Sequence, residues 1–252
     1  MIGTETLTPW LRVLNSPREP RLRLICFPYA GAGPGVFREW AAEMPPAIEL
    51  LGVHYPGREA RAGERPLANL SRLIGEVRSV LRPRLDLPFA FFGHSMGAYV
   101  AYEVARRLDQ QDGLRAEHLF LSGAPAPHLW GAKPLHQLPS REFLTEVIKL
   151  NGVPDEVLKS PEMLAYLLPV LRADFTACET HPFEDTTPMA LPLTVFGGRS
   201  DPRATAEQLA AWSSYAGSSF HLEMFEGDHF FVNARRRELL RKLFSELTIC
   251  LP

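Results

Sequence analysis

The sequence predicts a doubly wound α/β fold, in which helices cover both faces of a mostly parallel sheet. Six short runs are apolar on successive residues instead of alternate ones, which is typical of strands buried on both faces. These runs are residues 22–27, 49–53, 89–92, 119–121, 193–196 and 220–225. Helical patterns lie between them, and this strand–helix alternation favours parallel pairing.

The clearest helical pattern directly follows the third run. Between residues 97 and 108, apolar side chains recur at helical spacing, and the charged side chains fall outside the stripe. The stripe consists of Val100, Ala101, Val104, Ala105 and Leu108. A strand that runs straight into a helix is the repeating unit of the predicted fold.

Composition narrows the class of protein. The chain has 252 residues, 46% hydrophobic and 22% charged, so we expect one globular domain over residues 1–252. The formal net charge of −2 provides no basic field to attract nucleic acid. No stretch approaches the roughly 18 apolar residues of a membrane span. The first residues lack the basic start and apolar run of a secretory signal, so we expect a cytoplasmic protein without membrane attachment.

The three cysteines are far apart and include no C-x-x-C pair. They are Cys26, Cys178 and Cys250. Neither a disulfide framework nor a cysteine-based zinc site is expected from this spacing, and the thiols are predicted to be reduced.

One interval breaks the strand–helix alternation. Residues 126–192 contain no convincing strand and are predicted to be helical. An all-helical insertion between two strands is well placed to act as a lid over a site at the strand ends. Packing helices without a gating role are the alternative.

Within this insertion, start and stop signals predict the individual helices. Ser140 is expected to cap a helix over residues 141–150 that stops at Asn151 and Gly152. Pro161 suits the first turn of a second helix, and Pro169 is expected to interrupt it. A new helix would then carry one stripe of Val170, Leu171, Asp174, Phe175 and Cys178.

The strongest chemical motif is G-x-S-x-G at residues 93–97, between a predicted strand and a predicted helix. In a nucleophile elbow the chain turns sharply at this point, so the serine backbone is strained and its hydroxyl is exposed. Gly93 and Gly97 remove side chains that would clash across the turn. We therefore interpret Ser95 as a nucleophile, with an ordinary glycine-rich turn as the alternative.

A serine hydroxyl needs a base, and in this chain order the acid and then the histidine follow the serine. His229 lies just after the last apolar run and is the predicted base. Asp201 follows the preceding run and is predicted to orient the imidazole, although a solvated turn residue is the alternative. Asp228 adjoins His229 too closely to fold back onto it. His94 is expected to point away from Ser95, and His221 to be a wall residue.

Acyl transfer also needs N–H donors for the developing oxyanion. The amide of Met96, at the start of the elbow helix, is one candidate, and the loop at residues 27–35 is the expected source of another. This loop does not predict a dinucleotide site. It lacks G-x-G-x-x-G spacing, Pro34 removes an amide, and no acidic residue follows about twenty positions later.

Together the motifs resemble those of the type II thioesterases, discrete α/β-hydrolases that accompany polyketide synthases and nonribosomal peptide synthetases. The resemblance runs from about residue 22 to about residue 247. It rests on residues 27–33 (FPYAGAG), 55–58 (YPGR), 93–97 (GHSMG), 196–201 (FGGRSD) and 227–230 (GDHF). Residues 172–175 (RADF), in the insertion, are similar to the family's lid segment.

The resemblance implies hydrolysis of acyl groups from the phosphopantetheine arm of acyl or peptidyl carrier proteins, for editing or release of stalled units. It assigns Ser95 as nucleophile, His229 as base and Asp201 as its partner, with the amides of Ala30 and Met96 as oxyanion donors. No metal and no resident cofactor is implied, because phosphopantetheine arrives attached to the substrate.

The family's carrier domains tend to be acidic, so a local basic patch is expected on this chain. The candidates are Arg58, Arg61, Arg65, Lys149 and Lys159, each of which could equally be a solvated charge. Apolar residues of the insertion are candidates for the acyl pocket or for the core, namely Phe143, Leu167 and Phe175. A small-ester hydrolase or lipase, and a non-catalytic binding protein of the same fold, remain the rival functions.

Overall fold

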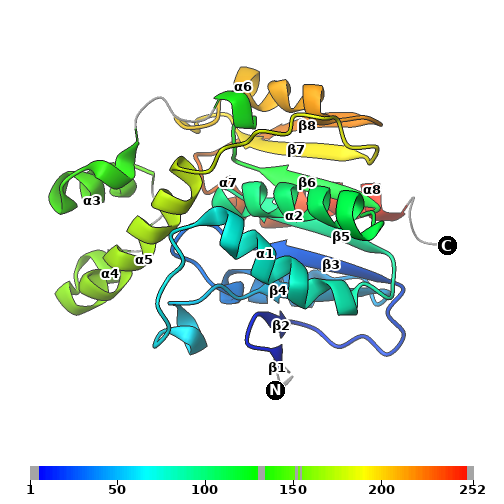
Figure 1. The fold of residues 1–252 in the computed structure, drawn as a ribbon, viewed down its shortest axis with the longest axis horizontal. Helices are drawn as coiled ribbons and strands as arrows, with labels where there is room; N and C mark the ends of the chain where they lie inside the picture. The colour runs from blue at the N-terminus through cyan, green and yellow to red at the C-terminus, as the bar shows by residue number, and fades with distance from the viewer. Residues whose placement is uncertain (1–5, 130–133, 151–152, 154, 249–252) are drawn as a thin grey trace.

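A single sheet organises the protein, as seen in the computed structural model, which describes residues 6–129, 134–150, 153 and 155–248 (Figure 1). Its eight strands follow the order β1-β2-β4-β3-β5-β6-β7-β8. They are β1 (Thr6–Thr8), β2 (Leu11–Val13), β3 (Leu22–Phe27), β4 (Ile48–Val53), β5 (Phe89–His94), β6 (His118–Ser122), β7 (Leu193–Gly198) and β8 (Phe220–Phe225). Pairing is antiparallel from β1 to β4 and parallel from β4 to β8. The predicted mostly parallel α/β sheet is therefore confirmed.

All six predicted strands form. β3 and β8 have the predicted bounds, and the other four extend by one or two residues. The antiparallel strands β1 and β2 were not predicted. Each has only three residues, which is too short for a run to stand out from its surroundings.

Burial on both faces explains why the strand runs do not alternate. In β3, Ile25 and Phe27 belong to one core cluster, and Leu24 and Cys26 belong to a second. The first cluster contains α1 (Leu70–Leu81) and α2 (Met96–Asp112), and the second contains η1 (Pro34–Glu43) and α8 (Arg236–Thr248). Helices thus cover both faces of the sheet.

The remaining short helices outside the insertion connect strands to these layers. They are η2 (Glu59–Arg61), η3 (Arg82–Arg84), α6 (Ala206–Ala210), η6 (Ala211–Tyr215) and α7 (Phe231–Ala234). In the part of the chain that the structure describes, no helix is both long and apolar enough to cross a bilayer.

Helices follow one another between β6 and β7. They are η4 (Pro127–Leu129), η5 (Leu135–Gln137), α3 (Ser140–Ile148), α4 (Asp155–Leu158) and α5 (Pro161–Glu179). Figure 1 shows α3, α4 and α5 beyond one end of the sheet. The stripe predicted on the last helix is buried as a unit on α5, and Phe143 of α3 and Phe175 of α5 share a small separate core.

Two predictions about these helices were wrong. Ser140 is the first residue of α3 and Pro139 is its N-cap, so the Ser140 hydroxyl does not cap the helix. Pro169 does not interrupt α5, which continues through it. Proline removes the hydrogen bond to the carbonyl four residues earlier, but Ala165 and Pro169 are both exposed, so water can bind that carbonyl. The predicted stop at residues 151–152 lies outside the described residues.

The predicted helix start at Pro161 is confirmed, and a cap that was not predicted precedes it. Pro161 occupies the first turn of α5, where its missing N–H costs nothing. Ser160 is the N-cap, and its hydroxyl oxygen accepts from the Met163 amide at 3.3 Å.

A buried histidine at the start of β6 makes stability depend on pH. His118 is only 3% exposed, and its ring stacks on Phe120 with the centroids 4.1 Å apart. Burial, assisted by the nearby charge of His221, lowers the pKa of His118 from 6.5 to about 4. The unfolded chain therefore binds more protons between these two pKa values, and the free energy of unfolding falls as the pH drops through that window.

We predict that His118→Gln reduces this acid sensitivity. Glutamine can still hydrogen-bond to Thr194, which lies 2.8 Å from the imidazole Nε2, but it does not titrate. Between about pH 7.5 and about pH 5, the variant should lose about 2 kcal/mol less stability than the parent protein. Urea unfolding at both pH values measures this difference. An equal loss in the two proteins would contradict the prediction.

Candidate active site

Ser95 occupies a sharp turn between β5 and α2. Its backbone has φ 53° and ψ −119°, a left-handed conformation that is strained for a non-glycine residue. A side chain at Gly93 would collide with the Gly97 carbonyl, and one at Gly97 would collide with the carbonyl of Phe27 at the end of β3. Both glycines of the motif are therefore required by close backbone contacts, as predicted for a nucleophile elbow.

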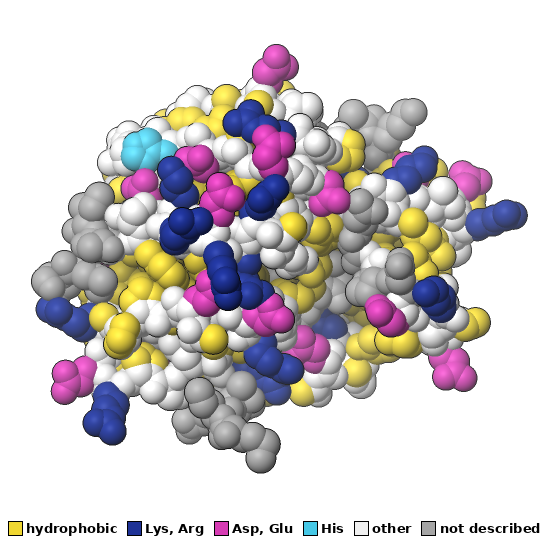
Figure 2. Space-filling model, turned by 180° about the vertical axis from the view of Figure 1, so that it is seen from behind, with side chains coloured by type: hydrophobic (Ala, Val, Ile, Leu, Met, Phe, Trp, Pro, Cys, Tyr) yellow, Lys and Arg dark blue, Asp and Glu magenta, His cyan; other side chains and the backbone are white. Residues whose placement is uncertain are grey.

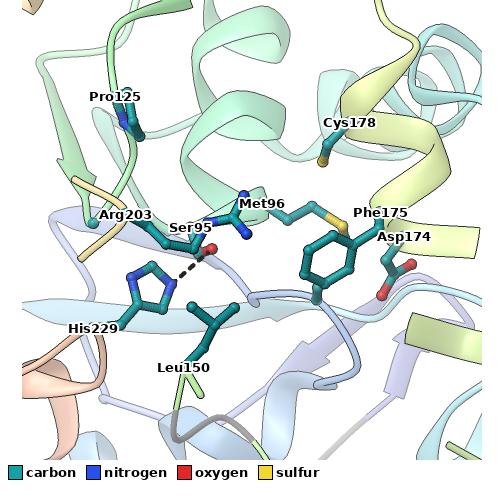
Figure 3. A pocket seen from close by; sticks show the side chains of 11 residues that line it. Ser95, Met96, Pro125, Leu150, Asp174, Phe175, Cys178, Arg203 and His229 are labelled. Atoms are coloured by element: carbon teal, nitrogen blue, oxygen red, sulfur yellow. Dashed lines mark hydrogen bonds between the residues drawn. The ribbon is translucent and has the colours of Figure 1, made fainter. Parts of the chain in front are cut away.

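His229 and Asp201 meet Ser95 from two other loops. The Nε2 atom of His229 lies 3.1 Å from Ser95 Oγ (Figure 3). The Nδ1 atom of the same ring lies 2.7 Å from Asp201 Oδ2. Because Nδ1 faces a carboxylate, it carries the ring proton and leaves Nε2 to accept the serine proton. The other Asp201 oxygen accepts from the Arg203 amide at 2.8 Å, which fixes the carboxylate. The structure thus brings the three predicted residues into one chain of hydrogen bonds.

The neighbouring titratable residues have other partners. His94 is fully buried, its Nδ1 lies 2.9 Å from Ser122 Oγ, and its ring lies beside that of His229. Burial, with the His229 charge, lowers the pKa of His94 well below its usual value, so this ring stays neutral. Asp228 accepts from the Phe230 amide in its own turn. His221 does not line the site, because it is exposed on β8 beside Glu246.

The residues predicted to supply the oxyanion donors, Ala30 and Met96, both lie at the serine. Ala30 lies in a turn closed by the hydrogen bond from the Ala32 amide to the Tyr29 carbonyl, 3.1 Å long. Met96 is the first residue of α2, where the amide has no acceptor within the helix. Within the described part of the chain, neither amide has a hydrogen-bond partner. Both residues line the cavity at Ser95, and their role as oxyanion donors stays a prediction.

Two mostly apolar cavities meet at Ser95 and His229. The space in them, part of it open to solvent, amounts to about 400 and about 320 Å³, and Ala30, Leu150 and Phe175 line both. The larger is further lined by Met96, Gly123, Pro125, Asp174, Cys178 and Arg203, and the smaller by Tyr29, Val147, Leu171 and Phe230. Figure 3 shows Phe175, Asp174 and Cys178 reaching the site from α5.

Of the three apolar residues proposed for an acyl pocket, only Phe175 lines it. Phe143 packs behind Phe175 with the ring centroids 5.4 Å apart, and Leu167 contacts Gly31. Sequence reasoning did not identify Asp174 and Arg203 as lining residues. The available signal for Asp174 was a carboxylate on the otherwise apolar stripe of α5.

The described cysteines are unsuited to nucleophilic chemistry. Cys26 and Cys178 are free and buried, and burial raises the pKa of each thiol well above its usual value. Cys250 lies outside the described residues. Among those residues, no group of three or more His, Cys, Asp or Glu side chains is arranged to hold a metal ion.

Two of the five basic residues proposed for carrier docking are buried, so they cannot contact a carrier protein. Arg58 is 3% exposed and paired with Asp174, and Arg61 is 7% exposed and bonded to Glu64 and the His54 carbonyl. The other candidates, Arg65, Lys149 and Lys159, are exposed. Figure 2 shows basic and acidic side chains interspersed over the back face of the molecule.

Known proteins share these features over nearly the whole chain. Residues 22–247 match the thioesterase domain family. The gramicidin S biosynthesis protein GrsT of Aneurinibacillus migulanus is 39% identical over 96% of this chain and 95% of its own. The linear gramicidin dehydrogenase LgrE of Brevibacillus parabrevis is 41% identical over 94% and 92%.

The fold is also that of a solved thioesterase. The type II thioesterase BorB from the borrelidin biosynthetic cluster superposes with a TM-score of 0.87 and 32% identity, covering 96% of this chain and 99% of BorB. This likeness agrees with the α/β-hydrolase arrangement of sheet, elbow and insertion described above. From the family match and the relatives together, the chain belongs to the thioesterase family.

Proposed function

We propose that this chain is a serine thioesterase that removes acyl groups from the phosphopantetheine arm of carrier proteins in polyketide or nonribosomal peptide synthesis. The observation that carries the proposal is the Ser95–His229–Asp201 chain of hydrogen bonds beside the amides of Ala30 and Met96. Membership of the thioesterase family supports a thioester as the bond that is cleaved. The relatives named for gramicidin and borrelidin biosynthesis support polyketide or nonribosomal peptide synthesis as the pathway.

In the proposed reaction, Ser95 Oγ attacks the thioester carbonyl while His229 Nε2 takes the hydroxyl proton. The carbonyl oxygen becomes an oxyanion and receives hydrogen bonds from the Ala30 and Met96 amides. Asp201 stabilises the imidazolium that forms. Collapse of the tetrahedral intermediate breaks the C–S bond, and the leaving pantetheine thiolate takes the proton from His229 Nε2, which leaves an acyl ester on Ser95 and a neutral His229.

Deacylation repeats these steps with water as the nucleophile. His229 takes a proton from water, the same two amides bind the second oxyanion, and the proton returns to Ser95 Oγ as the carboxylic acid leaves. A thiolate leaves readily, so the base chiefly serves to activate Ser95 and then water. No resident cofactor takes part in this proposal.

The surroundings of the triad support an acyl substrate carried by a partner. The cavities on either side of Ser95 are mostly apolar, which suits an acyl group and part of the pantetheine arm. We propose that α3 to α5 act as a lid over these cavities. The role of Arg65, Lys149 and Lys159 in binding an acidic carrier stays a prediction.

The dehydrogenase name of the relative LgrE does not extend to this chain. The loop after β3 lacks the G-x-G-x-x-G spacing of a dinucleotide site, and Asp174 accepts the Gly31 amide in it. Ala30, the residue before Gly31 in this loop, lines the cavity at Ser95 and not a nucleotide site. The geometry favours acyl transfer over hydride transfer.

We predict that Ser95→Ala abolishes acyl release without unfolding the protein. Removing the nucleophile should lower kcat for an acyl carrier protein by at least about 10⁴-fold. Ser214→Ala, at an exposed serine of η6, is the matched control and should retain the parent kcat. Thermal unfolding should be similar in all three proteins. Near-normal turnover by Ser95→Ala would contradict the mechanism.

A second prediction separates a thioesterase from a small-ester hydrolase. With the same acyl group, kcat/KM should be at least about tenfold higher for the carrier-bound thioester than for its free oxygen ester. The reason is that carrier and pantetheine contacts add to transition-state binding only in the first substrate. A higher kcat/KM for the oxygen ester would favour the rival function.

A further inference from the structure

A buried ion pair joins the insertion to the loop that follows β4. The Arg58 guanidinium donates from one nitrogen to both Asp174 oxygens, at 2.8 and 3.0 Å. The side chains are only 3% and 2% exposed. A buried pair of this kind is seldom more stable than well-packed apolar residues, so fold stability alone does not account for charges at this position.

The Asp174 carboxylate also binds the loop after β3, which carries Ala30 and Gly31. The Gly31 amide donates to Asp174 Oδ2 at 2.7 Å. Gly31 has φ +79° at the third position of the turn from Tyr29 to Ala32, so its amide direction is set by an unusual backbone conformation. Holding this amide fixes the peptide next to Ala30. Ala30 itself lines the cavity at Ser95.

Apolar contacts press α5 onto the same glycine. A Cβ atom at Gly31 would lie 2.8 Å from Leu171 Cδ2 and 3.3 Å from Leu167 Cδ1, so a side chain there would displace these leucines, and the positive φ would strain it as well. Arg58 is itself held over the Tyr55 ring, 5.4 Å from its centroid. The turn that carries Ala30 is therefore shaped by α5 through both packing and a charged hydrogen bond.

We propose that Asp174 is a positioning residue for the oxyanion-binding amide of Ala30, and that Arg58 acts through Asp174. In this arrangement the oxyanion site is complete only while α5 is docked on the loop. The inference rests on the proposed function of Ser95 and assigns a role to the two motifs, YPGR and RADF, that the triad leaves unused.

Near-isosteric variants test the proposal. In Asp174→Asn one oxygen becomes an NH₂ donor. In place of Oδ2 it faces the Gly31 amide, and that hydrogen bond is lost; in place of Oδ1 it faces the Arg58 guanidinium, so the ion pair is lost and a neutral amide oxygen alone holds Gly31. In Arg58→Lys a single ammonium replaces the planar fork but keeps the charge. Tyr166→Phe is the matched control, because the Tyr166 hydroxyl donates to the Gly57 carbonyl at 2.9 Å and ties α5 to the same loop without contacting Gly31.

The measurements are kcat and KM for an acyl carrier protein, the inhibition constant of an acyl-pantetheine trifluoromethyl ketone, and the melting temperature. The ketone forms a tetrahedral oxyanion with a serine, so it reports on the oxyanion site apart from turnover. Asp174→Asn should lower kcat by about 10- to 100-fold and raise the inhibition constant of the ketone by the same factor. This effect is smaller than the loss of a whole oxyanion donor, and KM should change by less than about threefold. Arg58→Lys should be intermediate, and Tyr166→Phe should match the parent.

The proposal is overturned if Asp174→Asn folds and keeps kcat and ketone inhibition within about threefold of the parent. It is equally overturned if Tyr166→Phe shows the same losses as Asp174→Asn. Any contact that ties α5 to the rest of the protein would then explain the losses, without a specific role for the Asp174–Gly31 hydrogen bond. Failure of the proposed function itself looks different. In that case the parent protein neither hydrolyses the acyl carrier nor binds the ketone.

Discussion

The close approach of the elbow helix to the end of β3 is the constraint on which the site depends. Gly97 lies so near the Phe27 carbonyl that no side chain fits between them, and Gly93 has the same relation to Gly97. This contact forces Ser95 into its strained turn. It also brings the start of α2 against the loop that leaves β3, so Met96 and Ala30 both line the cavity at Ser95.

The sheet supplies the other half of the geometry. β5, β6, β7 and β8 are parallel neighbours, so their carboxyl ends lie along one edge and the loops after them converge. Asp201 follows β7 and His229 follows β8, which explains how residues far apart in sequence form consecutive hydrogen bonds. Helix α5 of the insertion contributes Asp174 and Phe175 to the site.

Sequence patterns sufficed for the elements whose signals are local. Runs apolar on both faces predicted the parallel strands, and the glycine spacing around Ser95 predicted the elbow. The contacts of Asp174 were not predictable, because Arg58 and Gly31 lie 116 and 143 residues away in sequence and no spacing links them. Arg58 was misassigned to the surface for the same reason. Pro169 was misjudged because the cost of a helix-interior proline depends on exposure, which the sequence does not reveal.

Trapping the acyl-enzyme tests the central claim most directly. A carrier protein bearing a short acyl group is mixed with the enzyme, quenched in acid within the first turnover, and digested for mass spectrometry. The expected result is an acyl mass increase on the peptide that contains Ser95, which disappears as hydrolysis is completed. Turnover of the acyl carrier with no acylated Ser95 peptide at any time, under conditions in which an acyl serine standard survives the quench, would contradict the claim.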